Sequence, residues 1–184
     1  MQPTRLRPRP TAARPSAQRE PFDIVRHAEA LHVLHPGDVL CLLSGGRMQT
    51  LLGSCVAICM TDPARRVGAM CHIVHSAPPR PGSERDTAFA EPAMRRLFAE
   101  LRAHGVDPLA CEAHLCGGGV MSLVGLNPAN LVGERNVQWA RRFLASHHIP
   151  THEMALGGAF YRKLSWEVGQ GEPTVESLPI SGGG

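Results

Sequence analysis

Residues 51–75 read LLGSCVAICMTDPARRVGAMCHIVH, and this stretch decides the interpretation of the fold. Residues 56–60 form a continuous apolar run, residues 61–63 are a Thr-Asp-Pro turn signal, and residues 67–74 are apolar again. Short apolar runs bounded by turn residues are typical of β-strands. The stretch therefore predicts a β-hairpin.

The register of this hairpin determines whether two reactive side chains meet. If Met60 pairs with Val67 across residues 61–66, Cys55 lies directly opposite His72. Directly opposed residues have Cα atoms about 4.5 to 5.5 Å apart and point to the same face, so a thiol there is within reach of an imidazole. A shift of one residue would put the two on opposite faces, and a six-residue loop does not fix the register.

A Cys–His pair is chemically useful because the thiolate is the nucleophile and is scarce for a free cysteine of pKa about 8.5. A neighbouring imidazole lowers that pKa or accepts the proton. Gly53 and Ser54 precede Cys55 and permit a tight bend whose amides would hold a developing oxyanion. A buried structural role is the ordinary alternative for any one cysteine, and it is the role expected for those in apolar runs: Cys41, Cys59, Cys111 and Cys116.

Metal binding is the competing interpretation of the same segment, through Cys55, Cys59, Cys71, His72 and His75. Their spacings are not those of the paired knuckles of structural zinc sites. Neighbouring residues of a strand also point to alternate faces, which separates the potential ligands. We expect neither a bound metal nor another cofactor.

The rest of the chain mixes strands with amphipathic helices. Residues 91–104 place apolar side chains three and four apart, with Pro92 in the first turn and Gly105 at the C-terminal cap position, and residues 136–147 form a second such helix. Further strands are predicted at 39–43, 109–116, 154–156, 161–168 and 174–180. This order favours α+β layers over a purely parallel βαβ sheet.

Composition limits the class of protein. The 184 residues suit one domain, expected over residues 21–184. Residues 1–20 hold five arginines against one glutamate, a charge of +4 against +3 for the whole chain, so the remainder is near neutral. With four prolines and few apolar residues, residues 1–20 are expected to be a disordered basic tail.

A near-neutral body with 4% aromatic residues argues against a nucleic-acid-binding surface. Apolar runs stay well below the roughly 20 residues of a transmembrane helix. Arg and Pro interrupt the N-terminal region, which therefore lacks a secretory apolar segment. We expect a cytoplasmic protein with reduced thiols.

Several motifs, in order, resemble the CheD family of chemoreceptor glutamine deamidases of bacterial chemotaxis. They are LLGSCVAI at 51–58 with GAMCH at 68–72, CEAHLCGGGV at 111–120, GERNV at 133–137, and LGG at 156–158 followed by Arg162-Lys163. The resemblance spans about residues 39–180. It implies an α+β layered sandwich with mixed or antiparallel sheets, similar to bacterial toxin-type cysteine deamidases. Within GERNV, Gly133 is expected at a helix entry, with Arg135 and Asn136 fixing a loop through hydrogen bonds.

The resemblance also implies roles for individual residues. Cys55 is similar in position to the family's nucleophile and His72 to its general base. The family has a threonine six residues before the cysteine; that position is Gln49 here, with Thr50 one residue later. Either residue is therefore a candidate for the third role of orienting His72, and Thr50 is expected to fill it only if a β-bulge re-aims its side chain.

The activity implied is hydrolysis of a receptor glutamine to glutamate and ammonia through a Cys55 thioester, with a methylesterase activity by the same acyl chemistry. The implied partners are methyl-accepting chemotaxis proteins and a CheC-type phosphatase. The alternative is a catalytically weakened CheD-like binding module for these partners. It is motivated by Gln49 and by Ala155, which stands where the family often has an aspartate.

Overall fold

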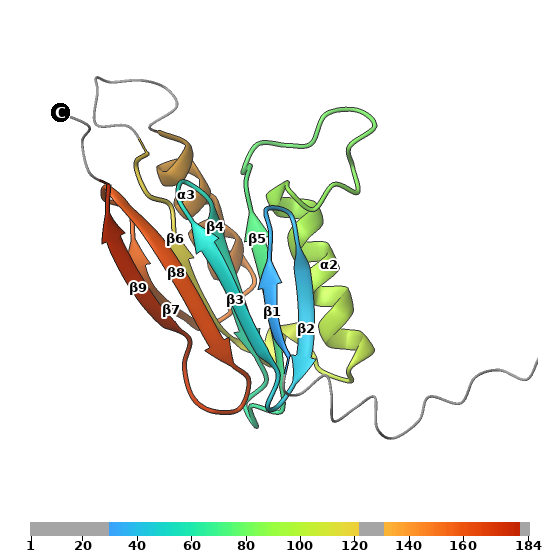
Figure 1. The fold of residues 1–184 in the computed structure, drawn as a ribbon. Helices are drawn as coiled ribbons and strands as arrows, with labels where there is room; N and C mark the ends of the chain where they lie inside the picture. The colour runs from blue at the N-terminus through green and yellow to red at the C-terminus, as the bar shows by residue number, and fades with distance from the viewer. Residues whose placement is uncertain (1–29, 122–130, 181–184) are drawn as a thin grey trace, which may run out of the picture.

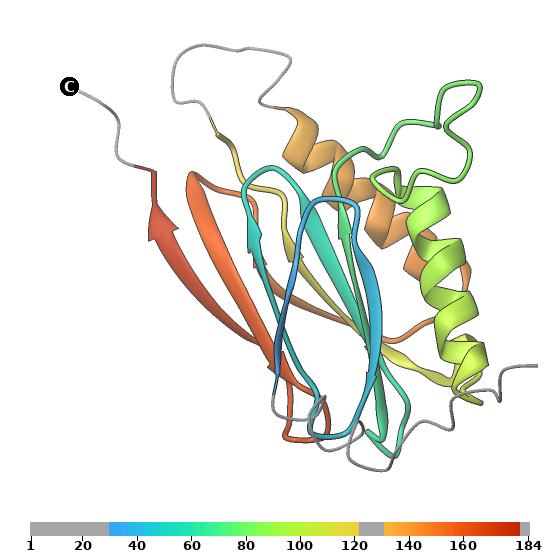
Figure 2. The same ribbon diagram turned by 45° about the vertical axis from the view of Figure 1, so that its right-hand side comes forward.

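The structure is a computed structural model that describes residues 30–121 and 131–180. Two β-sheets lie face to face, and both helices cover the outer face of one of them (Figures 1 and 2). The predicted α+β layered sandwich is confirmed. The expected disordered tail of residues 1–20 lies outside the described residues.

The two sheets differ in size and in strand direction. The smaller is a four-stranded sheet in the order β1-β3-β8-β9, and the larger is a five-stranded sheet in the order β2-β5-β4-β6-β7. The pairs β1–β3 and β6–β7 are parallel, and every other pair is antiparallel. The four-stranded sheet consists of β1 (Leu31–Leu34), β3 (Arg47–Leu52), β8 (Phe160–Glu167) and β9 (Thr174–Pro179). The five-stranded sheet consists of β2 (Val39–Leu43), β4 (Val56–Thr61), β5 (Val67–Ile73), β6 (Glu112–Gly117) and β7 (Thr151–Leu156).

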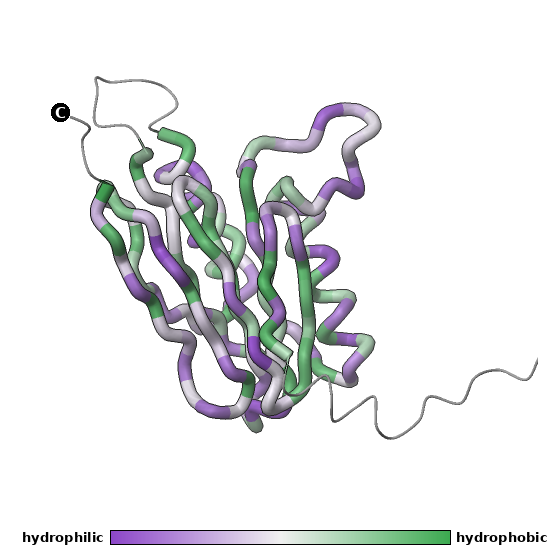
Figure 3. Tube along the Cα trace, in the orientation of Figure 1, coloured by the Kyte–Doolittle hydropathy of each residue, from purple (hydrophilic) through white to green (hydrophobic). Residues whose placement is uncertain are grey.

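The helices are α2 (Ala90–Ala103) and α3 (Leu131–Ser146), with a short 3-10 helix at Pro108–Ala110. Helix α2 begins and ends within a residue of its prediction, because its apolar side chains repeat on one face and Gly105 adopts a positive φ of 75° just beyond its C-cap. Figure 3 shows this helix alternating between hydrophobic and hydrophilic colour. No helix of the described residues is long and apolar enough to cross a membrane.

Two separate cores hold the layers together. One lies between the helices and the five-stranded sheet and includes Ile58, Leu97 and Leu144. The other lies between the two sheets and includes Met48, Met70 and Leu164. The central strands β4 and β5 are buried along their whole length because both of their faces are covered. They carry continuous apolar runs for the same reason.

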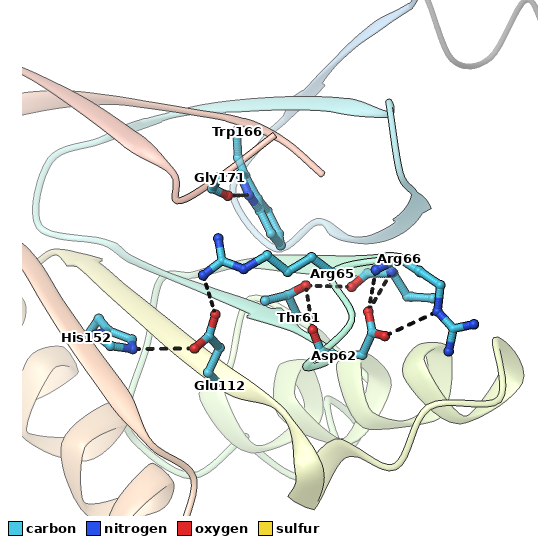
Figure 4. A network of polar contacts seen from close by, with 9 residues as sticks. Thr61, Asp62, Arg65, Arg66, Glu112, His152, Trp166 and Gly171 are labelled. Carbon is cyan, nitrogen blue, oxygen red and sulfur yellow. Dashed lines mark hydrogen bonds and ion pairs between the residues drawn. The ribbon is translucent and has the colours of Figure 1, made fainter. Parts of the chain in front are cut away.

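The turn between β4 and β5 sets the register of the central hairpin. One carboxylate oxygen of Asp62 accepts the backbone N–H groups of Arg66 and Val67 at 2.7 and 2.8 Å. Figure 4 shows this turn beside the ion pairs that link Arg65 and His152 to Glu112, and the Trp166 indole that donates to Gly171. The Asp62 side chain closes the loop from inside, which leaves Thr61 in the ladder opposite Gly68.

The predicted register is therefore wrong. Met60 pairs with Ala69 rather than Val67, and His72 pairs with Ala57 rather than Cys55. The displacement is two residues, and because side chains alternate with a period of two, it leaves His72 and Cys55 assigned to the same face.

Candidate functional site

The candidate nucleophile Cys55 ends a bend that connects β3 to β4. All three carbonyls of this bend accept a hydrogen bond: Gly53 O from the Gly119 N–H (2.8 Å), Ser54 O from the side-chain amide of Asn136 (3.1 Å), and Cys55 O from the Gly118 N–H (2.7 Å). Two donors come from the glycine turn after β6 and one from α3. The backbone that carries the thiol is thus held from two sides.

Close backbone packing explains the glycines at this end of the molecule. Gly117 has φ +113°, and a Cβ there would collide with the carbonyl oxygen of Cys55. A Cβ on Gly133, in the first turns of α3, would collide with the carbonyl of Gly118. Gly133 therefore lies inside the helix, since α3 begins at Leu131 and not at the predicted residue 136, and it lets the helix approach the glycine turn.

The candidate base His72 points into the layer between the sheets, where its Nδ1 lies 2.8 Å from the hydroxyl oxygen of Thr50. That hydroxyl also donates to the carbonyl of Leu34 at 2.8 Å. A carbonyl can only accept, so the single hydroxyl proton of Thr50 is committed to Leu34. Thr50 Oγ1 must then accept from Nδ1–H, and the imidazole keeps its lone pair on Nε2.

His72 Nε2 is buried and has no hydrogen-bond partner among the described residues. A buried nitrogen without a partner is costly, and such atoms in a native structure call for an explanation. The backbone of His72 is fixed on its other side, because its N–H donates to Asp38 O and its carbonyl accepts from the Gly37 N–H. The ring is thus held in one orientation with one free basic nitrogen.

Both reactive groups are neutral in the resting protein. Burial lowers the pKa of His72 to about 4, against smaller opposing effects of the Leu34 carbonyl and Asp38. Burial also raises the pKa of the Cys55 thiol above its ordinary value, while its own backbone N–H lowers it in part. The arrangement suits general-base removal of the thiol proton during attack, rather than a preformed thiolate–imidazolium pair.

Cys55 is half-buried and packs against the core between the sheets, the same layer that His72 enters. It precedes Ala57, the partner of His72, by two residues, so the two are diagonal neighbours across β4 and β5. Diagonal neighbours on one face have Cα atoms about 7 to 8 Å apart with Cβ atoms somewhat closer, a separation that larger side chains bridge.

Of the two candidates for the third role, only Thr50 reaches His72. Gln49 points to the outer face of the four-stranded sheet and donates to Ser165 Oγ at 3.0 Å. Thr50 is completely buried and faces inward without a bulge, because β3 pairs in unbroken register with β1 and β8. The predicted need for a bulge is wrong, since Thr50 faces His72 from a strand whose pairing with both neighbours is regular.

The potential zinc ligands are divided between the two cores. Cys55 and Cys59 pack between the sheets, whereas Cys71 packs on the helix side with its Sγ 3.9 Å from Met94 Sδ. The described residues contain no group of three or more His, Cys, Asp or Glu side chains arranged to hold a metal ion. The four cysteines predicted to be structural are all buried: Cys41, Cys59, Cys111 and Cys116.

Of two further contributors to the site, the sequence predicted one in part and gave no signal for the other. Asn136 was expected to fix a loop, and it does so at the residue next to the nucleophile. The carbonyl of Leu34 was missed, because a backbone atom that orients Thr50 has no signature in residue type. The position of this carbonyl relative to Thr50 depends on the pairing of β1 with β3.

Comparisons with known proteins point in one direction. Residues 75–177, more than half of the chain, match the family described as "CheD chemotactic sensory transduction". A protein of Albidiferax ferrireducens named "Probable chemoreceptor glutamine deamidase CheD 2" is 31% identical over 85% of this chain and 88% of its own length. A Dechloromonas aromatica protein named "Probable chemoreceptor glutamine deamidase CheD 3" is 34% identical over 76% of this chain and 82% of its own.

Among solved structures, YlmD from Geobacillus stearothermophilus is similar with 13% identity and a TM-score of 0.38, over 70% of this chain and 60% of that chain. The family match and the two relatives, each above 30% identity over most of its own length, establish that this chain belongs to the CheD family.

Proposed function

We propose that this protein is a cysteine-dependent protein-glutamine deamidase that acts on methyl-accepting chemoreceptors. The observation that carries the proposal is the neutral His72 ring, oriented by Thr50 and left with a free Nε2 in the layer where the Cys55 thiol packs. The names of the relatives, probable chemoreceptor glutamine deamidases, support the substrate class. The site of action is then the cytoplasm.

The first half of the reaction forms a thioester. His72 Nε2 removes the Cys55 thiol proton as sulfur attacks the carboxamide carbon of a receptor glutamine, which gives a tetrahedral oxyanion. The C–N bond then breaks, and the nitrogen leaves as ammonia after it receives the proton from His72. The backbone amides of the Gly53–Ser54–Cys55 bend are the proposed oxyanion donors.

The second half restores the enzyme. His72 takes a proton from water, whose oxygen attacks the thioester carbonyl. Collapse of the new tetrahedral intermediate expels the Cys55 sulfur, which regains its proton, and the receptor keeps a glutamate. A glutamate methyl ester enters the same sequence with methanol as the leaving group, so methylesterase activity belongs to the same proposal.

The alternative, a binding module without turnover, has less support than the sequence alone gave it. Gln49 had suggested a lost third residue, but Thr50 makes the hydrogen bond to His72. Ala155 still departs from the aspartate that the family often has at this position. A CheC-type phosphatase as partner stays a prediction.

The test is to incubate the protein with the cytoplasmic fragment of a methyl-accepting receptor. Released ammonia is measured, and conversion of glutamine to glutamate is followed by peptide mass spectrometry. The proposal predicts one ammonia for each glutamate formed, with both lost in Cys55→Ala and in His72→Ala. Binding of the receptor fragment without ammonia release would support the binding module instead.

A further inference from the structure

Asn136 of α3 connects the segment that carries the nucleophile to the strand that carries the base. Its side-chain amide nitrogen donates to Ser54 O at 3.1 Å and to Val74 O at 2.9 Å. Ser54 directly precedes Cys55, and Val74 follows His72 by two residues. Both acceptors are carbonyls, so the orientation of the amide group follows from the contacts themselves.

The contact with Ser54 fixes the peptide plane between Ser54 and Cys55. In a trans peptide the carbonyl and the following N–H point in opposite directions. The carbonyl of Ser54 points to α3, which covers the outer face of the five-stranded sheet. The N–H of Cys55 must therefore point away from the helix, into the layer between the sheets where the thiol packs.

The Cys55 N–H and the Cys55 sulfur belong to one residue and are therefore close together. This N–H lowers the pKa of the Cys55 thiol, against the larger opposing effect of burial. An N–H beside the attacking sulfur is also close to the carbonyl carbon that the sulfur attacks. It is in the right region to meet the oxyanion that develops there.

Asn136 also carries a cost that simple packing does not explain. It is 1% exposed, and its Oδ1 is buried without a partner among the described residues. A buried amide oxygen without a hydrogen-bond partner destabilises the folded protein. The other two carbonyls of the bend are held by backbone donors of the glycine turn, so only the Ser54 carbonyl depends on a side chain.

We propose that Asn136 is a positioning residue that aims the Cys55 backbone N–H at the tetrahedral oxyanion, by holding the Ser54–Cys55 peptide plane through the Ser54 carbonyl. The inference rests on the proposed function, because it assigns a role within the same acyl-transfer site. It predicts that loss of the Asn136 amide impairs acylation of Cys55 but leaves its alkylation unchanged.

Two probes of the same thiol separate these steps. Acylation by p-nitrophenyl acetate proceeds by attack of the Cys55 sulfur on the ester carbon, through an oxyanion that collapses to acetyl-Cys55 and p-nitrophenolate. Iodoacetamide alkylates the same sulfur by displacing iodide, without an oxyanion. The ratio of the two rate constants at one pH therefore reports on oxyanion stabilisation, while changes in thiol ionisation cancel.

The variants are Asn136→Ala, which removes the amide, and Asn136→Asp, which keeps the shape but loses the donor. Gln138→Ala is the matched control, because Gln138 is exposed on the same helix and donates to Glu134 at 3.0 Å. Each protein is purified by gel filtration, and its circular dichroism is compared with that of wild type. If one variant fails to fold, the other is measured.

The expected result is a fall of about 10- to 100-fold in the acylation-to-alkylation ratio for both Asn136 variants and none for the control. An unchanged ratio in the Asn136 variants would overturn the inference. Equal losses of both rates also leave the ratio unchanged, and they would mean that Asn136 acts on His72 through Val74. A wild-type protein that is alkylated at Cys55 but never acylated would instead count against the proposed function.

Discussion

At the scale of single residues, the hydroxyl of Thr50 contacts one group that can only accept a hydrogen bond and one that can donate. It donates to Leu34 O and lies 2.8 Å from His72 Nδ1. Because its only proton goes to the carbonyl, the histidine must supply the other one. In our proposal Thr50 is the third member of the site, and its hydroxyl oxygen holds the imidazole in one tautomer and orientation, as a carboxylate does in other such sites.

Replacing Thr50 by valine should therefore disable the base while keeping the volume. We expect Thr50→Val to lower the kcat of receptor deamidation by on the order of 100-fold, since general-base assistance is worth roughly 10² to 10⁴. Thr50→Ser should retain most of the activity because it keeps the hydroxyl. Gln49→Ala is the matched control from the other face of β3, and equal losses in Gln49→Ala and Thr50→Val would contradict the assignment.

The buried imidazole also makes stability depend on pH. His72 has a pKa of about 4 in the folded protein against an ordinary value of 6.5, so the unfolded chain binds more protons between these values. Its contribution to stability is complete above pH 6.5 and is lost as the pH falls toward 4. Between about pH 7.5 and pH 5 the loss is about 2 kcal/mol.

This loss can be measured by urea unfolding at the two pH values. His72→Gln should show a pH dependence smaller by about that amount. The variant comparison isolates His72 from His114, whose pKa is lowered in the same direction by burial. The same pH dependence in both proteins would mean that His72 is not a buried neutral base.

The residues of the candidate site could be predicted from the sequence only in part. The sequence predicts Cys55 and His72 as a pair because thiol and imidazole have distinctive chemistry, but the hairpin register that put them directly opposite each other is wrong. The choice between Gln49 and Thr50 could not be made from the sequence. It depends on which face of β3 each side chain takes, and the pairing of β3 with β1 and β8 sets that face.

At the scale of elements, the contact between α3 and the glycine turn positions the candidate nucleophile Cys55. Gly133 lies within α3, where alanine would ordinarily be more stable than glycine by about 1 kcal/mol. Its missing Cβ is instead required, because a side chain there would collide with the carbonyl of Gly118. The two effects have opposite signs, which makes the substitution informative.

We expect Gly133→Ala to destabilise the protein by about 1 to 3 kcal/mol, as overpacking does, and to lower deamidation as the helix and turn separate. Thermal unfolding and ammonia release measure the two effects. A variant as active as wild type and more stable would show that α3 does not approach the turn this closely.

Element prediction succeeded where one physical signal dominated. β2 is observed at the predicted residues, and β4 and β5 within one residue, because continuous apolar runs mark strands covered on both faces. β1 and β3 were not predicted, since their residues alternate between core and solvent over only four and six positions. The hairpin register was wrong because the Asp62 side chain, not the strand sequence, closes the turn.

At the scale of the whole molecule, the residues of the candidate site come from both sheets and from the helix layer. The four-stranded sheet supplies Thr50, the five-stranded sheet supplies His72 and the start of β4, and α3 supplies Asn136 (Figure 1). Element order was enough to predict a layered α+β fold. The facing of two sheets could not be predicted, because it depends on contacts between residues far apart in the chain.

The central claim is that Cys55 forms the bond to the receptor. The most direct measurement is ammonia released from a receptor cytoplasmic fragment by wild type, Cys55→Ala and Cys41→Ala, the last being a buried thiol in the other core. We predict release by wild type and Cys41→Ala and none by Cys55→Ala. Release at the wild-type rate by folded Cys55→Ala would contradict the account.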